Sequence, residues 1–64
     1  MFFSEEQLKI AMLVQCGKTN IEIGEELGYS AESIKKRLSG IYKKLGIKRR
    51  IELAKILSGK KYFI

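Results

Sequence analysis

The feature that most limits how this chain can fold is the spacing of four apolar residues in and beside its most basic segment. Residues 35–50 contain eight Lys or Arg side chains and no Asp or Glu. On a helix with about 100° per residue, the apolar residues fall within about 60° of one another. They are Ile34, Leu38, Ile41 and Leu45. The segment is therefore predicted to be an amphipathic helix that packs against a core and presents a basic outer face.

Capping residues predict where four helices begin and end. Ser4, Thr19 and Ser30 can each cap a first turn, and Gln7 and Glu22 lie at the third position that completes a capping box. A glycine follows the expected end of each helix, as is common for the left-handed closing residue. The expected helices cover residues 4–16, 19–27, 30–45 and 49–57. The last five residues, KKYFI, are expected to fray or to add to a dimer contact.

The absence of strand-like alternation makes this an all-α chain, and its 64 residues allow one domain spanning 1–64. Two of the expected helices are joined by a short turn at Gly28–Tyr29, and the second of them is basic on its outside. This arrangement is a helix-turn-helix candidate.

Charge is separated along the sequence. Residues 1–32 carry two Lys against six Glu, a net charge of −4, and residues 33–64 carry eleven Lys or Arg against Glu52, a net charge of +10. Lysines kept only for solubility would not need this separation. A basic half attached to an acidic half indicates one surface that attracts a polyanion. Duplex DNA is favoured over RNA, because no stacking aromatic residues are interleaved with the basic residues of the third helix.

Composition argues against several other classes of protein. Cys16 is the only cysteine and there is no His, which excludes a disulfide or a cysteine-based zinc site within one chain. No apolar run or secretory signal is visible, so a cytoplasmic protein without a membrane span is expected. No pair of groups suggests acid–base or nucleophilic chemistry, so neither enzymatic activity nor a cofactor or metal is expected. Cys16 is expected to fill a small position at the edge of the core.

Residues 17–53, GKTNIEIGEELGYSAESIKKRLSGIYKKLGIKRRIEL, resemble the DNA-binding domain of LuxR/GerE-type transcription regulators. With Phe3–Ser4 standing for the family's Leu–Thr start, the resemblance covers nearly the whole chain. The length resembles GerE-like members that consist of this domain alone. The positions that match the family pattern are Gly17, Asn20, Ile23–Gly24 (Ile–Ala in the pattern), Leu27, Ser30, Ser33–Ile34–Lys35, Arg37–Leu38, Ile41, Lys44–Leu45–Gly46–Ile47 and Arg50–Ile51–Glu52.

The resemblance implies a four-helix domain whose third helix enters the major groove of double-stranded DNA and whose fourth helix dimerises. The family's base-reading positions correspond to Lys35, Lys36 and Ser39. Its backbone-contacting positions correspond to Thr19, Asn20, Ser33, Arg37, Lys43 and Lys44. The free amides of a helix N-terminus would also suit a phosphate near Thr19 or Ser30.

Four departures from the family pattern change local expectations. Gln7 stands where a Glu is usual, so an ion pair with Arg50 cannot form, and Arg37 replaces a His. Arg49 stands at the polar cap position before the fourth helix, which loses an N-cap worth ~1 kcal/mol. Gly40 costs a similar ~1 kcal/mol relative to Ala. We expect Gly40 to be tolerated rather than required for a close backbone approach.

Several large apolar side chains are expected on the surface: Leu8, Met12, Ile21 and Ile51. They are either scattered apolar residues of a small protein or a surface for a partner. Ile51 with Lys55 is expected to form a weak homodimer contact, and Leu8 with Met12 is the competing candidate. The alternative function is a protein-interaction module that sequesters another transcription regulator through these apolar residues.

Overall fold

The computed structural model describes residues 3–58 and contains four helices there. They are α1 (Glu5–Gln15), α2 (Asn20–Leu27), α3 (Ala31–Leu45) and α4 (Arg50–Ser58). The predicted all-α, four-helix architecture is confirmed, and the expected bounds are correct to within one residue. The C-terminal segment KKYFI lies outside the described residues.

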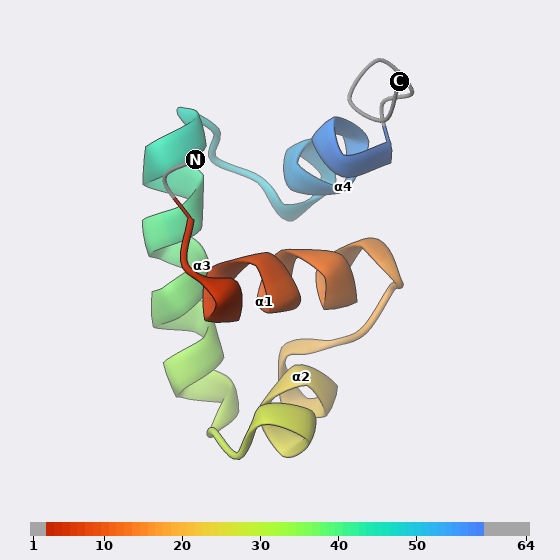
Figure 1. Ribbon diagram of the computed structural model, residues 1–64, viewed down its shortest axis with the longest axis vertical. Helices are drawn as coiled ribbons and strands as arrows, with labels where there is room; N and C mark the ends of the chain where they lie inside the picture. Colours follow the sequence, from red (N-terminus) through yellow and green to blue (C-terminus); the bar gives the residue numbers. More distant parts are fainter. Residues whose placement is uncertain (1–2, 59–64) are drawn as a thin grey trace.

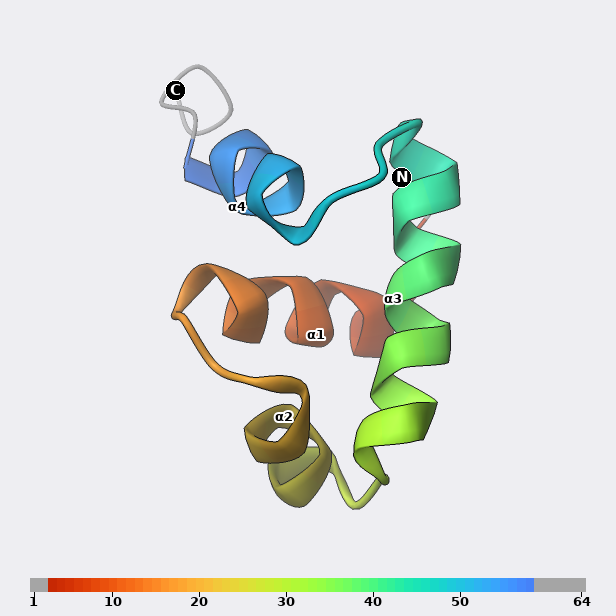
Figure 2. The ribbon, with the colours of Figure 1, turned by 180° about the vertical axis from the view of Figure 1, so that it is seen from behind.

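The other three helices are arranged around α1, which runs across the middle of the molecule with α4 on one side and α2 on the other (Figure 1). The long helix α3 lies along one end of this layer, as the view from behind also shows (Figure 2). Because α3 packs against α2 and α1 along one side only, its other side is left for solvent or a ligand.

Within the described part of the chain, one apolar cluster holds the helices together. Ile10, Ile23, Ile34, Ile41 and Leu53 are at most 1% exposed, so every helix contributes at least one fully buried side chain. Ala11, Val14 and Leu38 complete the buried set. The apolar stripe predicted on α3 therefore faces the core, with Leu45 half-buried at its end.

The predicted caps are present. Ser4 and Thr19 form capping boxes with Gln7 and Glu22, and the Ser30 hydroxyl accepts a hydrogen bond from the Ser33 amide at 3.1 Å. The α4 start differs from the expectation of an absent cap. The Glu52 carboxylate accepts hydrogen bonds from the backbone N–H groups of Lys48 and Arg49, at 3.1 and 2.9 Å. An acidic side chain in the first turn thus replaces part of the lost cap.

The turn between α2 and α3 is tight. Gly28 closes α2 with a φ of 83°, in the left-handed region that favours glycine. The Gly24 carbonyl accepts hydrogen bonds from the N–H groups of both Gly28 and Tyr29, at 2.8 Å each. A Cβ at Gly24 would lie 2.3 Å from the Tyr29 carbonyl oxygen, so the absence of a side chain allows this close approach.

The expectation for Cys16 was wrong, because the thiol is exposed. Helix α1 ends at Gln15, and Cys16 is its C-cap residue, followed by Gly17 with a φ of 84°. The chain turns away at this point, and the side chain is not carried onto the core face.

Candidate nucleic-acid interface

The outer face of α3 carries the residues predicted to read bases. Lys35, Lys36 and Ser39 are exposed, as is Lys43. Neither an ion pair nor a hydrogen bond engages the side chains of Lys35, Lys36 and Lys43 within residues 3–58. Three ammonium groups on one helix, exposed and without a partner among the described residues, attract an anionic ligand.

The start of α2 was predicted to contact phosphate, but some of its polar groups are already hydrogen-bonded within the protein. The Thr19 hydroxyl oxygen accepts a hydrogen bond from the Glu22 amide at 3.1 Å, which leaves its O–H able to donate. The Thr19 amide donates to Glu22 Oε1 at 2.8 Å. This backbone hydrogen bond is the main cause that lowers the pKa of Glu22. The Thr19 amide is therefore already used by a carboxylate inside the protein.

Arg50 connects the start of α4 with the start of α2. Its Nη1 donates to Asn20 Oδ1 at 2.7 Å, and its Nη2 donates to the Lys18 carbonyl. The family ion pair that Gln7 cannot make is thus replaced by two neutral acceptors near the N-terminus of α2. Sequence reasoning missed this role of Arg50, since neither acceptor is acidic and both lie at least 30 residues away.

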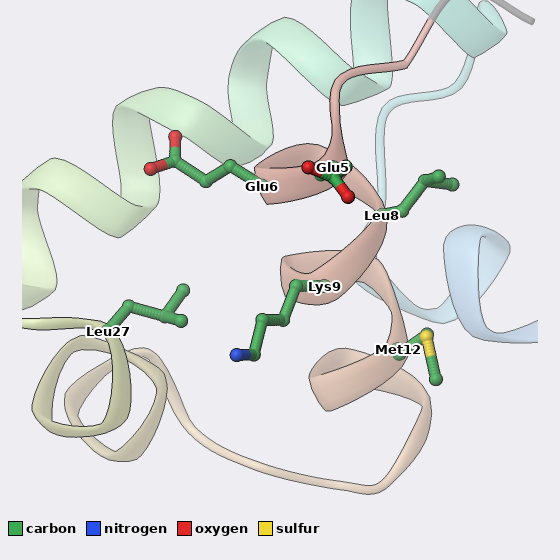
Figure 3. A pocket seen from close by; sticks show the side chains of 6 residues that line it. All are labelled: Glu5, Glu6, Leu8, Lys9, Met12 and Leu27. Carbon is green, nitrogen blue, oxygen red and sulfur yellow. The ribbon is translucent and has the colours of Figure 1, made fainter.

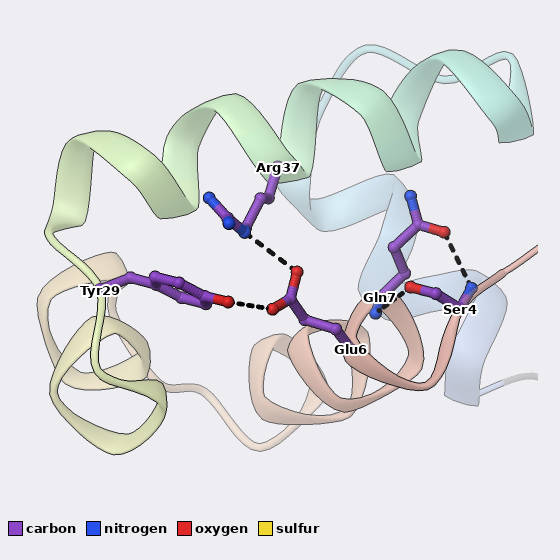
Figure 4. Close-up of polar contacts among 5 residues, drawn as sticks. All are labelled: Ser4, Glu6, Gln7, Tyr29 and Arg37. Atoms are coloured by element: carbon purple, nitrogen blue, oxygen red, sulfur yellow. Dashed lines mark hydrogen bonds and ion pairs between the residues drawn. The ribbon is translucent and has the colours of Figure 1, made fainter.

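One flank of α3 carries Arg37, which is held by residues of two other segments (Figure 4). Arg37 Nε donates to Glu6 Oε1 of α1 at 3.0 Å, and its guanidinium carbon lies 3.9 Å from the centroid of the Tyr29 ring. The Tyr29 hydroxyl donates to the other oxygen of Glu6. The hydrogen bonds from Tyr29 and then Arg37 lower the pKa of Glu6, and Glu6 in turn raises the pKa of Arg37.

Lys44, on the same flank, is held in a similar way by the first residues of the chain. Its Nζ donates to Gln7 Oε1 at 2.9 Å and lies 5.4 Å from the centroid of the Phe3 ring. The same Gln7 oxygen accepts the Ser4 amide at 3.0 Å in the capping box of α1. Glu6 and Gln7 lie in the capped first turn of α1, and neither was predicted to contact α3.

The predicted apolar surface residues are exposed: Leu8 40%, Met12 61%, Ile21 64% and Ile51 59%. Leu8 and Met12 border a shallow hollow between α1 and α2, lined also by Glu5, Glu6, Lys9 and Leu27 (Figure 3). Lys55, one turn after Ile51 on α4, is exposed as well. The apolar residues on helices α1, α2 and α4 are therefore available to a second protein chain.

Within residues 3–58, no group of three Cys, Asp or Glu side chains is placed to hold a metal ion. No helix in the same range has the length and apolar character needed to cross a membrane.

Known proteins resemble this chain in sequence. The model of the bacterial regulatory proteins of the luxR family matches residues 1–57. The chain is also 39% identical over 49 residues to the HTH-type transcriptional activator RamA of Corynebacterium glutamicum. That match covers 77% of this chain but only 17% of the relative. No solved structure matches significantly. The chain belongs to the luxR family of bacterial regulatory proteins, and its four helices form the helix-turn-helix DNA-binding domain of that family.

Proposed function

We propose that this chain regulates transcription by binding double-stranded DNA with α3 in the major groove. The observation that carries the proposal is the outer face of α3, where Lys35, Lys36 and Ser39 are exposed. The major groove admits one α-helix, and Lys can donate to the O6 and N7 atoms of guanine. The shorter Ser39 can make one weaker contact. These three residues are proposed to select the sequence.

Backbone contacts are proposed on both sides of this helix. The N-termini of α2 and α3 are proposed to bring Thr19, Asn20 and Ser30 to phosphates, where the helix dipole and the backbone amides that the caps do not use favour an anion. Along α3 the proposed phosphate contacts are Ser33, Arg37, Lys43 and Lys44. Such contacts fix the orientation of the domain on the duplex without reading its sequence.

Dimerisation is proposed through α4. Ile51 and Lys55 lie one turn apart, and both are exposed. A two-fold contact brings each patch against its own copy. Two α3 helices then occupy half-sites about one DNA turn, or ~10 bp, apart. We expect a weak dimer, since one nine-residue helix per chain buries little compared with a stable interface of ~1,600 Å².

The test is a titration of labelled duplexes at several salt concentrations. If about five phosphates are neutralised, log affinity should fall against log salt with a slope of about −4 to −5. A slope near zero, or no binding at low salt, would contradict DNA binding as the function.

A second candidate function is sequestration of another transcription regulator. It is supported by the exposure of Leu8, Met12, Ile21 and Ile51, which a domain that contacts only DNA does not need. The two functions separate in one experiment on the intact chain. Sequestration predicts that Leu8→Asp or Met12→Asp abolishes the effect on transcription while duplex affinity stays at the wild-type value.

A further inference from the structure

Arg37 and Lys44, which we call the flank cations, are held by the same two kinds of contact. Each is bonded to an acceptor in the first turn of α1, Glu6 or Gln7, and each lies against an aromatic ring. The two cations thus have the same kind of surroundings, except that the acceptor is a charged carboxylate at Arg37 and a neutral amide oxygen at Lys44.

The geometry at Arg37 leaves its terminal nitrogens available. Only Nε is bonded to Glu6, and the second Glu6 oxygen accepts from Tyr29 instead of from a guanidinium Nη atom. The guanidinium lies over the Tyr29 ring, but no hydrogen bond or ion pair within residues 3–58 joins its two Nη atoms to another group. Both Nη atoms point away from Glu6 (Figure 4). These two nitrogens form the planar fork that matches phosphate oxygens. The guanidinium is therefore held by Glu6 at its Nε edge, while the edge with the two Nη atoms can bind a phosphate.

Holding a long side chain before binding changes affinity. An arginine or lysine that is ordered only on the DNA loses rotamer freedom at that moment, which weakens binding by about 2- to 10-fold per side chain. A side chain already ordered in the free protein does not incur that loss. The side chains of Arg37 and Glu6 are 35% and 40% exposed, so the cluster can be reached from solvent.

We infer that the neighbours of the flank cations are positioning residues, which hold these cations ready for the phosphates on one side of the major groove. They are Glu6 and Tyr29 at Arg37, and Gln7 and Phe3 at Lys44. The inference rests on the proposed DNA binding and adds to it a role for the N-terminal turn of α1 and the turn before α3. Neither Glu6 nor Gln7 touches DNA in this account; both act through the cation they hold.

The substitutions compared within each background leave its net charge unchanged, because removing Glu6 would itself strengthen attraction to DNA. Tyr29→Phe removes the hydroxyl that holds Glu6 and keeps the ring under Arg37. Tyr42→Phe is the matched control, since Tyr42 is also a half-buried tyrosine against the core. Affinity for a labelled duplex is measured for each variant in the wild-type and in an Arg37→Gln background, with thermal melting as a check on folding.

With wild-type Arg37, Tyr29→Phe is expected to lower duplex affinity about 2- to 10-fold, by the same factor for all duplex sequences. In the Arg37→Gln background, Tyr29→Phe should cause no further loss of affinity. Tyr42→Phe should change nothing in either background. Phe3→Leu, tested against Lys44→Gln, should repeat the pattern at the second cation.

Equal losses in both backgrounds would show a merely structural role and overturn the inference, as would tighter binding by Tyr29→Phe. If Arg37→Gln binds duplexes with unchanged affinity and salt slope, the inference fails while DNA binding stands. If the wild-type chain binds no duplex at low salt, both fail.

Discussion

Replacing Gly40 with alanine should stabilise the free protein, whereas the same replacement at Gly24 should destabilise it. Both glycines lie inside helices, where alanine is favoured by ~1 kcal/mol. A Cβ built at Gly40 meets no atom of another part of residues 3–58 within 4 Å, so Gly40→Ala should gain the full ~1 kcal/mol. In a domain of this size, ~1 kcal/mol raises the melting temperature by roughly 4–8 °C.

At Gly24 the steric cost should exceed the gain. A Cβ would lie 2.3 Å from the Tyr29 carbonyl oxygen and 3.2 Å from its carbon, and moving that peptide moves the start of α3. Overpacking typically costs ~1–3 kcal/mol. We expect the upper part of this range, because backbone rather than a flexible side chain must shift. The net change should therefore be destabilising by up to ~2 kcal/mol.

The assay is thermal unfolding by circular dichroism for both variants beside the wild type, followed by duplex titration of Gly40→Ala. The LuxR/GerE pattern has alanine where this chain has Gly24, so the steric cost proposed here is specific to the tight turn of this chain. A Gly24→Ala protein that melts at a higher temperature than the wild type would refute the reasoning about the turn. A Gly40→Ala protein that is more stable but binds DNA more weakly would show that this glycine is needed for a close approach to the duplex.

Lys36→Ala should change the preferred operator in a selection experiment, with ~1–3 kcal/mol lost at one base pair, and an unchanged preferred sequence would refute its role as a base reader. Lys44→Ala should instead weaken all sequences alike and make the salt slope about 0.9 less steep. Ile51→Asp should reduce the dimer in sedimentation, whereas dissociation by Leu8→Asp alone would move the self-association surface to α1. Because the folded-state pKa of Glu6 is lowered from 4.5, its contribution to stability should be present above pH 4.5 and lost below it as the carboxyl protonates. Melting of Glu6→Gln should therefore depend less on pH in that acidic range than melting of the wild type.

Local signals in the sequence predicted the helices of this domain. Ser4, Thr19 and Ser30 each cap the helix expected from them, because a cap and its partner lie within one turn of each other. The spacing of apolar residues in α3 likewise predicted its buried face, because residues three or four apart lie on the same side of a helix. The four exposed apolar residues were also predicted correctly, since a helix fixes which residues share its buried side.

The side-chain cluster around Arg37 could not be predicted in this way. Tyr29 lies 23 residues and Arg37 31 residues from Glu6, so their contacts depend on the angles at which three segments pack. The Tyr29 ring packs against the core, but the sequence carried no signal for the partner of its hydroxyl. Glu52 was not predicted to cap α4, although it lies three residues after Arg49, because the side chain of Arg49 cannot complete a capping box.

The most direct test of α3 as the reader of DNA is to change one groove of the duplex at a time. In a selected operator, 7-deazaguanine removes the N7 acceptor from the major groove, and inosine removes the guanine amino group from the minor groove. We predict that 7-deazaguanine at one or more positions weakens binding by up to ~1–3 kcal/mol, that Lys36→Ala is less affected at that position, and that inosine has little effect. Loss of affinity with inosine but not with 7-deazaguanine at any position would contradict the placement of α3 in the major groove.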